Sequence, residues 1–414
     1  MSVIADLPDI RPSLLLDFAN SGRAHPLIQC TRASTATCYG PDRRLRNVAA
    51  NVPRIDYDPA TGKCLGLLVE STRTNTALNS DTFSSWTKSR STVVDTTVPS
   101  PDPTKFAKKL VDNTELNEHV VNYAFTPAAS TTYVFSCFLK AAERNFAFIS
   151  IRNFANQTVG WSVSIDLTTY QTFGAPTSTA GETLTITPLP DGWCRVSLST
   201  TTIAAPVGTI NPTLGAKDSL TASGTYVGDG TSGIYIFGAQ VEVGASPSSY
   251  IPTAGAAVTR AADLVSIDYT LPTVGAIVSS LAGVSSANSS NAYVWSAINP
   301  ADHNADHAYF YYPGASQSTN WWVNKGGVGQ SGGNVLGRRQ SAGFCFDASA
   351  KTAAIASGSL LFEDTTRPKD FPSNLSQLLL GRSRTNANFL NGCISRLAVY
   401  SGRITNAQLQ RLTA

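Results

Sequence analysis

Short stretches in which apolar and polar residues alternate dominate the chain. A period of two is typical of β-strands with one buried face. Turn-forming residues such as Asp191-Gly192 separate the stretches, and no sustained helical period interrupts them. The clearest strands are predicted at Ser13–Phe18, Leu65–Val69, Thr131–Lys140, Phe146–Ile151, Trp161–Leu167, Trp193–Ser199, Ile234–Val243, Leu264–Leu271, Ala276–Leu281, Ala292–Ile298, Ala308–Tyr312, Gly343–Asp347, Leu375–Gly381 and Ile394–Tyr400. The pattern therefore predicts an all-β protein built from antiparallel sandwiches of the jelly-roll type.

One helix is predicted, at the C-terminal end. Thr405 and Gln408 have the spacing of a capping box, in which each residue satisfies a backbone N–H of the other. Leu409 and Leu412 follow three positions apart and would share one apolar face.

The segment Gly233–Asp263 divides the chain. Strict alternation would place Tyr235, Phe237, Ala239, Val241 and Val243 on one face of a strand. Gly, Pro and Ser then break the pattern, and a new alternating stretch begins near Leu264. Two sandwiches in tandem, stacked rather than swinging, are therefore expected behind an irregular N-terminal segment. The predicted boundaries are residues 1–75 for the N-terminal segment, 76–252 for the first sandwich, 253–263 for a linker and 264–414 for the second sandwich.

Composition excludes several classes of partner. Only 14% of the 414 residues are charged, and 31 Lys and Arg stand against 28 Asp and Glu. No long basic run is present, so nucleic-acid binding is not expected. No apolar run approaches the roughly 18 residues of a membrane span. The N-terminus lacks the pattern of a secretory signal, which favours folding in the cytosol.

Cysteine usage indicates neither a disulfide framework nor a zinc site. The seven cysteines include no Cys-x-x-Cys pair. A Cys30–Cys38 or Cys38–Cys64 bond remains an alternative to reduced thiols. His303 and His307 are spaced for a metal site, but the segment is interpreted as an exposed loop, and no metal or cofactor is expected.

Aromatic residues are the candidates for a binding site. Flat rings that reach solvent can stack on the apolar side of a sugar, while amides bind its hydroxyls. The densest cluster of aromatic residues consists of Trp321-Trp322 with Tyr309, Tyr311 and Tyr312 nearby. Alternation predicts that one Trp points inward and one outward. The candidate carbohydrate-binding residues are Trp193, Tyr311, Trp321, Trp322 and Asn324, although core packing or a subunit interface is an alternative role for the cluster.

Catalysis is not expected. Glycoside hydrolysis needs two carboxylates roughly 5–9 Å apart, and no paired acidic motif is present. The nucleophile elbow and the phosphate-binding loop are also missing from the sequence.

Several motifs resemble those of tailed-phage virion surface proteins. Arg54–Asp58, Gly66–Glu70 and Arg73-Thr74-Asn75 resemble a motif recurrent in phage and prophage structural proteins. Asp191-Gly192-Trp193-Cys194-Arg195 resembles the Asp-Gly-Trp-Tyr-Arg strand of phage jelly rolls akin to carbohydrate-binding modules, with Cys194 in place of the aromatic. Ser249–Thr253 resembles the end of that domain. Phe389–Ile394, together with Leu397–Tyr400, resembles the last hairpin of concanavalin A-like (laminin-G-like) domains.

This resemblance implies a fibre or spike on a phage tail or head. It implies a homotrimer assembled in the bacterial cytoplasm, attached to other virion proteins through residues 1–75 and binding host surface glycans without enzymatic activity. A purely structural decoration protein is the main alternative. A capsule depolymerase is a third hypothesis, which the lack of an internal repeat of 20 to 50 residues disfavours.

Overall fold

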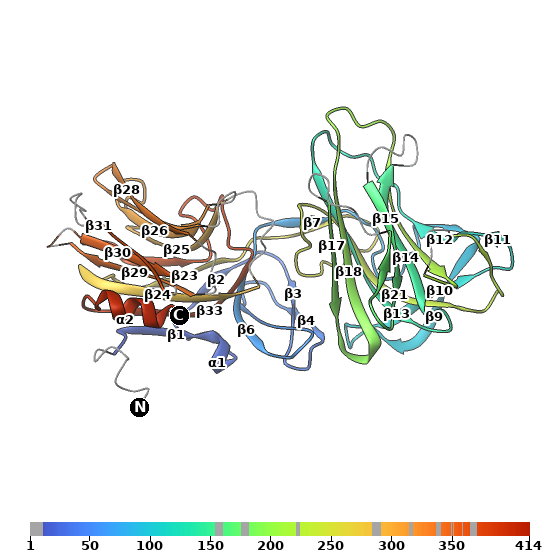
Figure 1. The fold of residues 1–414 in the computed structure, drawn as a ribbon, viewed down its shortest axis with the longest axis horizontal. Coiled ribbons are helices and arrows are strands. Elements are labelled where there is room, and N and C mark those ends of the chain that lie inside the picture. Colours follow the sequence, from blue (N-terminus) through green and yellow to red (C-terminus); the bar gives the residue numbers. More distant parts are fainter. Residues whose placement is uncertain are drawn as a thin grey trace.

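The computed structural model confirms the all-β architecture. It describes residues 11–153, 160–174, 182–220, 224–283, 291–313, 318–336, 341–348, 350, 352–357, 359–364 and 371–414. Strands account for 53% of the chain and helices for 4%. Every sheet pairing is antiparallel, and two sandwiches lie at opposite ends of an elongated molecule (Figure 1).

Two sheets of six strands form the first sandwich, and a short ribbon flanks them. Their inward side chains make one continuous core, which includes Trp161 as the alternation predicted. One sheet has the order β17 (Thr183–Pro188), β18 (Trp193–Thr201), β13 (Thr132–Ala141), β21 (Gly233–Val243), β10 (Phe106–Asp112) and β9 (Ser91–Pro99). The other has the order β16 (Thr172–Phe173), β15 (Gly160–Asp166), β14 (Phe146–Asn153), β19 (Ile210–Lys217), β12 (His119–Asn122) and β8 (Thr87–Ser89). The ribbon pairs β11 (Leu116–Asn117) with β20 (Tyr226–Val227).

The alternation predicted for β21 is wrong, because a bulge at Gly238 interrupts the strand. Gly238 has φ = +63°, and the register against β13 shifts beside it. Ala239 and Val241 therefore point into the sandwich core, whereas Phe237 packs on the opposite side of the sheet against Tyr250. An extra residue in one strand reverses the face of every position that follows it, so a strict period of two failed at this point.

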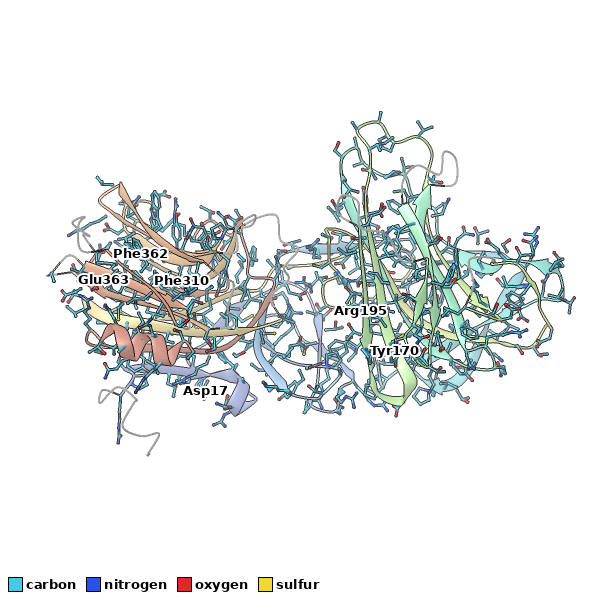
Figure 2. All side chains as sticks on the ribbon, viewed as in Figure 1. Asp17, Tyr170, Arg195, Phe310, Phe362 and Glu363 are labelled. Carbon is cyan, nitrogen blue, oxygen red and sulfur yellow. The ribbon has the colours of Figure 1, made fainter. Side chains whose placement is uncertain are left out.

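The second sandwich has a sheet of eight strands facing a sheet of seven, counted over the described residues. The first contains, in order, β31 (Leu360–Asp364), β30 (Thr352–Ser357), β29 (Ser341–Asp347), β24 (Val274–Ala282), β33 (Gly392–Tyr400), β6 (Cys64–Val69) and β5 (Arg54–Tyr57), while β1 (Leu14–Asp17) also pairs with β33. The second contains β2 (Gln29–Thr31), β23 (Leu264–Asp268), β32 (Gln377–Leu380), β25 (Ala292–Ile298), β26 (His307–Tyr312), β27 (Ser318–Lys325) and β28 (Val328–Leu336). Phe310 lies between the two sheets (Figure 2).

The N-terminal segment is not the irregular, separate piece that the sequence suggested. Four of its strands (β1, β2, β5 and β6) complete the two sheets of the second sandwich, and Leu16 and Leu67 are buried in that core. Two of these strands, β1 and β6, were predicted as Ser13–Phe18 and Leu65–Val69, but no local pattern showed that they join the second sandwich, because their partner β33 lies more than 300 positions away. The strands β2 and β5 have only three and four residues and carry too little periodicity to be recognised alone. Two further ribbons pair β3 (Ala36–Tyr39) with β4 (Leu45–Val48) and β7 (Arg73–Asn75) with β22 (Val258–Arg260).

Three helical turns complete the described elements. The predicted C-terminal helix is α2 (Asn406–Leu412), and both halves of its capping box, Thr405 and Gln408, are formed. Its Leu409 packs on the outer face of the eight-stranded sheet. The others are α1 (Phe18–Ser21) and a 3₁₀ turn, η2 (Pro190–Gly192). All seven cysteines are free thiols. Within the described ranges, the structure contains no helix long and apolar enough to cross a membrane.

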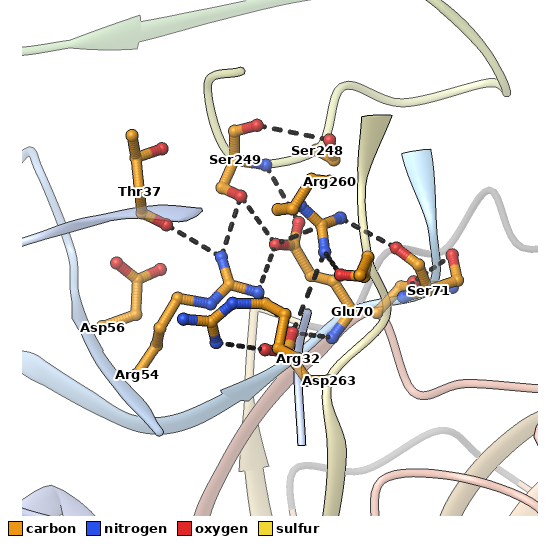
Figure 3. Close-up of polar contacts among 12 residues, drawn as sticks. Arg32, Thr37, Arg54, Asp56, Glu70, Ser71, Ser248, Ser249, Arg260 and Asp263 are labelled. Atoms are coloured by element: carbon orange, nitrogen blue, oxygen red, sulfur yellow. Dashed lines mark hydrogen bonds and ion pairs between the residues drawn. The ribbon is translucent and has the colours of Figure 1, made fainter. Parts of the chain in front are cut away.

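A buried cluster of charges ties the N-terminal segment to the linker between the sandwiches (Figure 3). Asp263 accepts hydrogen bonds from Arg32 at 2.8 Å and from the Glu70 N–H at 2.9 Å, and it also pairs with Arg54. Glu70 pairs with Arg54 at 2.8 Å and with Arg260 at 3.5 Å. We call Arg32, Arg54, Glu70, Arg260 and Asp263 the joint cluster. All five side chains are buried.

Hydrogen bonds connect the joint cluster to the loop that follows β21. Ser249 donates its N–H and its hydroxyl to the two carboxylate oxygens of Glu70, at 2.9 and 2.7 Å. Asn75 holds the next turn by donating to the carbonyls of Ala239 and Ile251. Because each of these polar groups is paired, the linker is fixed to both sandwiches at many points rather than tethered by one strand.

Candidate functional site

The outward face of the seven-stranded sheet carries a group of aromatic side chains on β25, β26 and β27. Along β26, Ala308, Phe310 and Tyr312 point into the core. The intervening Tyr309 and Tyr311 therefore point outward, with His307 in phase at the start of the strand. Polar residues at these positions would be the usual choice for a solvent-facing sheet surface, so the aromatic residues need another explanation.

Strand register brings the rings of neighbouring strands together. Tyr309 lies directly opposite Trp322, and Tyr311 lies opposite both Tyr293 and Asn320. The rings of Tyr309 and Trp322 are nearly parallel, with planes 6° apart and centroids 6.4 Å apart. The Tyr293 and Tyr311 rings stack at 5.3 Å. We define the aromatic face as Tyr293, His307, Tyr309, Tyr311 and Trp322.

Glycine on the adjoining strand leaves room for the indole. A Cβ atom at Gly329 would lie 2.3 Å from Cζ2 of Trp322. Trp322 therefore lies across the backbone of β28, and its side chain remains partly exposed. A flat ring supported in this way has little freedom to move, which favours stacking with a ligand because less side-chain entropy is lost on binding.

Amide groups alternate with the rings on β27. Asn320 and Asn324 flank Trp322 at i−2 and i+2, so all three point to the same side of the sheet. The Oδ1 atoms of both Asn residues are buried and have no hydrogen-bond partner among the described residues, and the same is true of Nδ1 of His307. Buried polar atoms are normally satisfied, so these three have hydrogen-bonding capacity to spare, which a ligand hydroxyl reaches only after a side-chain rotation.

Electrostatics keep His307 neutral. Burial lowers the pKa of His307 to about 4, and the positive charge of Arg384 acts in the same direction. Burial also raises the pKa of Tyr309. His307 and Tyr309 therefore carry no charge near pH 7, and Arg384 is the cation beside them.

The predicted site residues fall in three places. Tyr311, Trp322 and Asn324 are together on the outward side of the seven-stranded sheet, as a common face requires. Trp321 points inward, is 2% exposed, and packs with its ring 5.0 Å from Phe344. It is core and offers no ring face to a ligand. The alternation correctly predicted one Trp on each side, but it could not say which.

Trp193 is also buried, which corrects its assignment to an exposed ligand face. It lies on the side of β18 opposite the sandwich core, as expected, yet it is 2% exposed. Leu45 of the N-terminal segment and Tyr250 of the loop after β21 cover it, and its Nε1 donates to the carbonyl of Pro99 at 3.2 Å. Segments distant in sequence provide this cover, so strand alternation could not reveal it.

Four residues of the site were absent from the predicted set: Tyr293, His307, Tyr309 and Asn320. The signal for Tyr309 was available, because it is two positions from Tyr311. His307 was assigned to a loop, although it begins β26. Tyr293 lies in the predicted strand Ala292–Ile298, but only the register of β25 against β26 brings it to the rings.

No metal centre was found in the part of the chain that the structure describes: no three His, Cys, Asp or Glu side chains are grouped closely enough to hold an ion. The exposed His303 and the buried His307 do not form such a group.

Comparison with known proteins gives distant structural likenesses only. No family model and no curated protein matches the chain. The CBM40 domain of the Ruminococcus gnavus IT-sialidase, bound to alpha2,3 sialyllactose, aligns with 18% identity over 35% of this chain and 84% of its own, with a TM-score of 0.30. Mouse laminin alpha1 domains LG4-5 align with 10% identity over 69% of this chain and 86% of their own, with a TM-score of 0.18. At such TM-scores neither likeness supports an inference, and the sandwich architecture rests on the strand pairing itself.

Proposed function

We propose that the protein binds glycans through the aromatic face and that it does so without chemical conversion of the sugar. The observation that carries this proposal is the pair of nearly parallel rings, Tyr309 and Trp322, bordered by the unpartnered amide oxygens of Asn320 and Asn324. A pyranose ring would stack on the indole, and its hydroxyls would donate to the amide oxygens.

The biological setting follows from the motif resemblance and is part of the same proposal. The protein is a fibre or spike on the surface of a tailed-phage virion, assembled in the bacterial cytoplasm, that recognises host surface polysaccharide. Each site would bind weakly, and a trimer displaying several faces would gain avidity of roughly 10² to 10⁴ over a single site when geometry permits. Attachment to other virion proteins would use exposed side chains of residues 1–75, because the backbone of β1, β2, β5 and β6 is already paired.

A glycan array with purified protein tests the proposal. We expect binding to bacterial surface polysaccharides, and Trp322→Ala should weaken it about tenfold per site, the equivalent of one good stacking contact. Phe106→Ala is the matched control, because Phe106 is an aromatic residue 62% exposed on the other sandwich. Absence of binding to any glycan and to host cells would refute the proposal, as would unchanged binding by folded Trp322→Ala. A reducing-end assay on host capsule checks that no cleavage accompanies binding.

One observation favours the alternative role of a structural decoration protein. β31 is an edge strand with three consecutive apolar residues exposed, Leu360, Leu361 and Phe362, at 39%, 37% and 37%. Figure 2 shows Phe362 at the end of the molecule remote from the first sandwich. Exposed apolar edges pair readily with other chains. Light scattering of Phe362→Lys against the unsubstituted protein would test this, with loss of an oligomer expected if the edge is an interface.

A further inference from the structure

A cleft of about 400 Å³ lies between the first sandwich and the N-terminal segment. Its walls come from β17 and β18, from β3, β5 and β6, and from residues 246–250 of the loop after β21. The volume is in the range of small-molecule sites, roughly 300–1,000 Å³, which occur preferentially between domains. The cleft is separate from the aromatic face, which lies on the second sandwich.

The wall that the first sandwich contributes to the cleft carries polar side chains at alternate strand positions. Thr185 lies opposite Ser197, and Thr187 lies opposite Arg195, in the register of β17 and β18. All four line the cleft, whereas the alternating Ile186, Val196 and Leu198 point into the core. Within the described residues, the hydroxyls of Thr185, Thr187 and Ser197 enter no hydrogen bond. They are therefore available to a ligand that carries hydroxyl groups.

Arg195 has no carboxylate partner among the described residues. Its guanidinium lies 5.4 Å from the centre of the Phe138 ring, and its Nη2 donates to the Ser136 hydroxyl at 3.0 Å. Its Nε is buried without a hydrogen-bond partner. Figure 2 shows Arg195 on the side of the first sandwich that faces the N-terminal segment. An arginine whose guanidinium packs against an aromatic ring and keeps N–H donors unused is the usual binding partner for a carboxylate.

The opposite wall adds a phenol hydroxyl and two carboxylates. The Tyr39 hydroxyl is buried, borders the cleft and lies beside the Arg195 guanidinium, without a hydrogen bond of normal geometry within the described residues. Of the two acids that line the cleft, Glu70 is neutralised by Arg54 and Arg260 in the joint cluster. The other, Asp56, accepts the N–H of Tyr39 at 2.7 Å and has no ion pair among the described residues, so a ligand carboxylate has to lie on the Arg195 side of the cleft.

We infer that this cleft binds a sugar acid, a monosaccharide-sized ligand whose carboxylate is held by Arg195 and Tyr39 and whose hydroxyls contact Thr185, Thr187 and Ser197. The inference extends beyond glycan recognition at the aromatic face, since it concerns a different site and a charged ligand. A neutral sugar would leave the Arg195 donors unused, and a simple anion such as acetate would leave the hydroxyl wall unused.

Titration calorimetry with D-glucuronate, using D-glucose and acetate as controls, tests the inference. We expect glucuronate to bind and both controls to bind at least about tenfold more weakly, as the loss of a charge-assisted hydrogen bond predicts. Arg195→Gln should abolish glucuronate binding, and Tyr39→Phe, which removes only the unpartnered hydroxyl, should weaken it severalfold. If Arg195→Gln fails to fold, Tyr39→Phe decides the question.

Three outcomes would overturn the inference: glucuronate binds no better than glucose, it binds no better than acetate, or folded Arg195→Gln binds it unchanged. Trp322→Ala separates this inference from the proposed function, because it should leave glucuronate binding intact. Loss of glucuronate binding in that variant would assign the ligand to the aromatic face and refute the cleft site.

Discussion

The guanidinium of Arg54 and the carboxylate of Asp263 form a buried ion pair across 209 positions of sequence. Arg54 belongs to β5, and Asp263 immediately precedes β23, so the pair joins the two sheets of the second sandwich at the point where the linker enters. Both side chains are at most 1% exposed, and neither charge could be left there alone without a large desolvation cost. The fold at this position therefore depends on the joint cluster.

Asp263→Asn should destabilise the protein by about 3–5 kcal/mol, because it leaves three arginines of the joint cluster buried with a single carboxylate, that of Glu70. Urea unfolding followed by tryptophan fluorescence measures the change. Asp95→Asn is the control: its ion pair with Lys108 is on the surface, with Asp95 89% exposed, and a change of about 1 kcal/mol or less is expected. Equal effects of the two substitutions would contradict the role assigned to the joint cluster.

Stability should pass through a maximum at mildly acidic pH. Burial alone would raise the pKa of Glu70, but Arg260 and Arg54 lower it below 4.5. Its stabilising contribution is therefore present above pH 4.5 and is lost as pH falls towards the lowered pKa. Burial raises the pKa of Asp56 from 3.8 to about 6, so the folded state binds more protons than the unfolded state in that interval. Stability is therefore lost as pH rises from about 4 to 6.

Asp56→Asn isolates the second effect. The amide oxygen can still accept the Tyr39 N–H, while the charge is removed. We expect Tm to rise by about 2–4 °C at pH 8, equivalent to about 1 kcal/mol, and to change little at pH 4. Thermal scans by circular dichroism at both pH values provide the measurement. A Tm that falls at pH 8 would show that the Asp56 carboxylate stabilises the fold as an anion.

Truncation of Trp321 should cost the protein more stability than truncation of Trp322. Trp321→Ala removes an indole from the core and should cost about 3–5 kcal/mol of stability. Trp322→Ala removes one partly exposed stacking partner of Tyr309 and should cost about 1 kcal/mol. Chemical denaturation of the two variants side by side gives the comparison. Similar losses would mean that Trp322 is structural and that the aromatic face is a packing surface.

Gly238→Ala tests the bulge in β21. Alanine at φ = +63° is strained, and its Cβ would lie 2.8 Å from Cδ2 of Phe138. A loss of roughly 1–3 kcal/mol is expected. Gly255→Ala is the matched control, because a Cβ there meets nothing within 4 Å. If urea denaturation finds Gly238→Ala as stable as the control, β21 tolerates a regular strand at this position.

Much of the local structure could be predicted, because it depends on neighbours in sequence. Strands such as β13 and β25 emerged from the period of two, and the capping box of α2 from the spacing of Thr405 and Gln408. The candidate site was predictable in part for the same reason. Trp322 and Asn324 are two positions apart on one strand, so alternation places them on the same face, whereas the register of β26 against β27 brings Tyr311 to them.

The sequence by itself determined the all-β class, the position of the break between the sandwiches and the presence of an aromatic cluster, since these follow from local periodicity and turn chemistry. Only the tertiary structure decided that Trp193 is covered, that residues 14–69 complete the second sandwich, and that Arg195 and Tyr39 meet across a cleft. Each of these depends on pairing between segments far apart in the chain. Such pairing is selected by the burial of whole faces and the satisfaction of buried charges, and no local pattern records it.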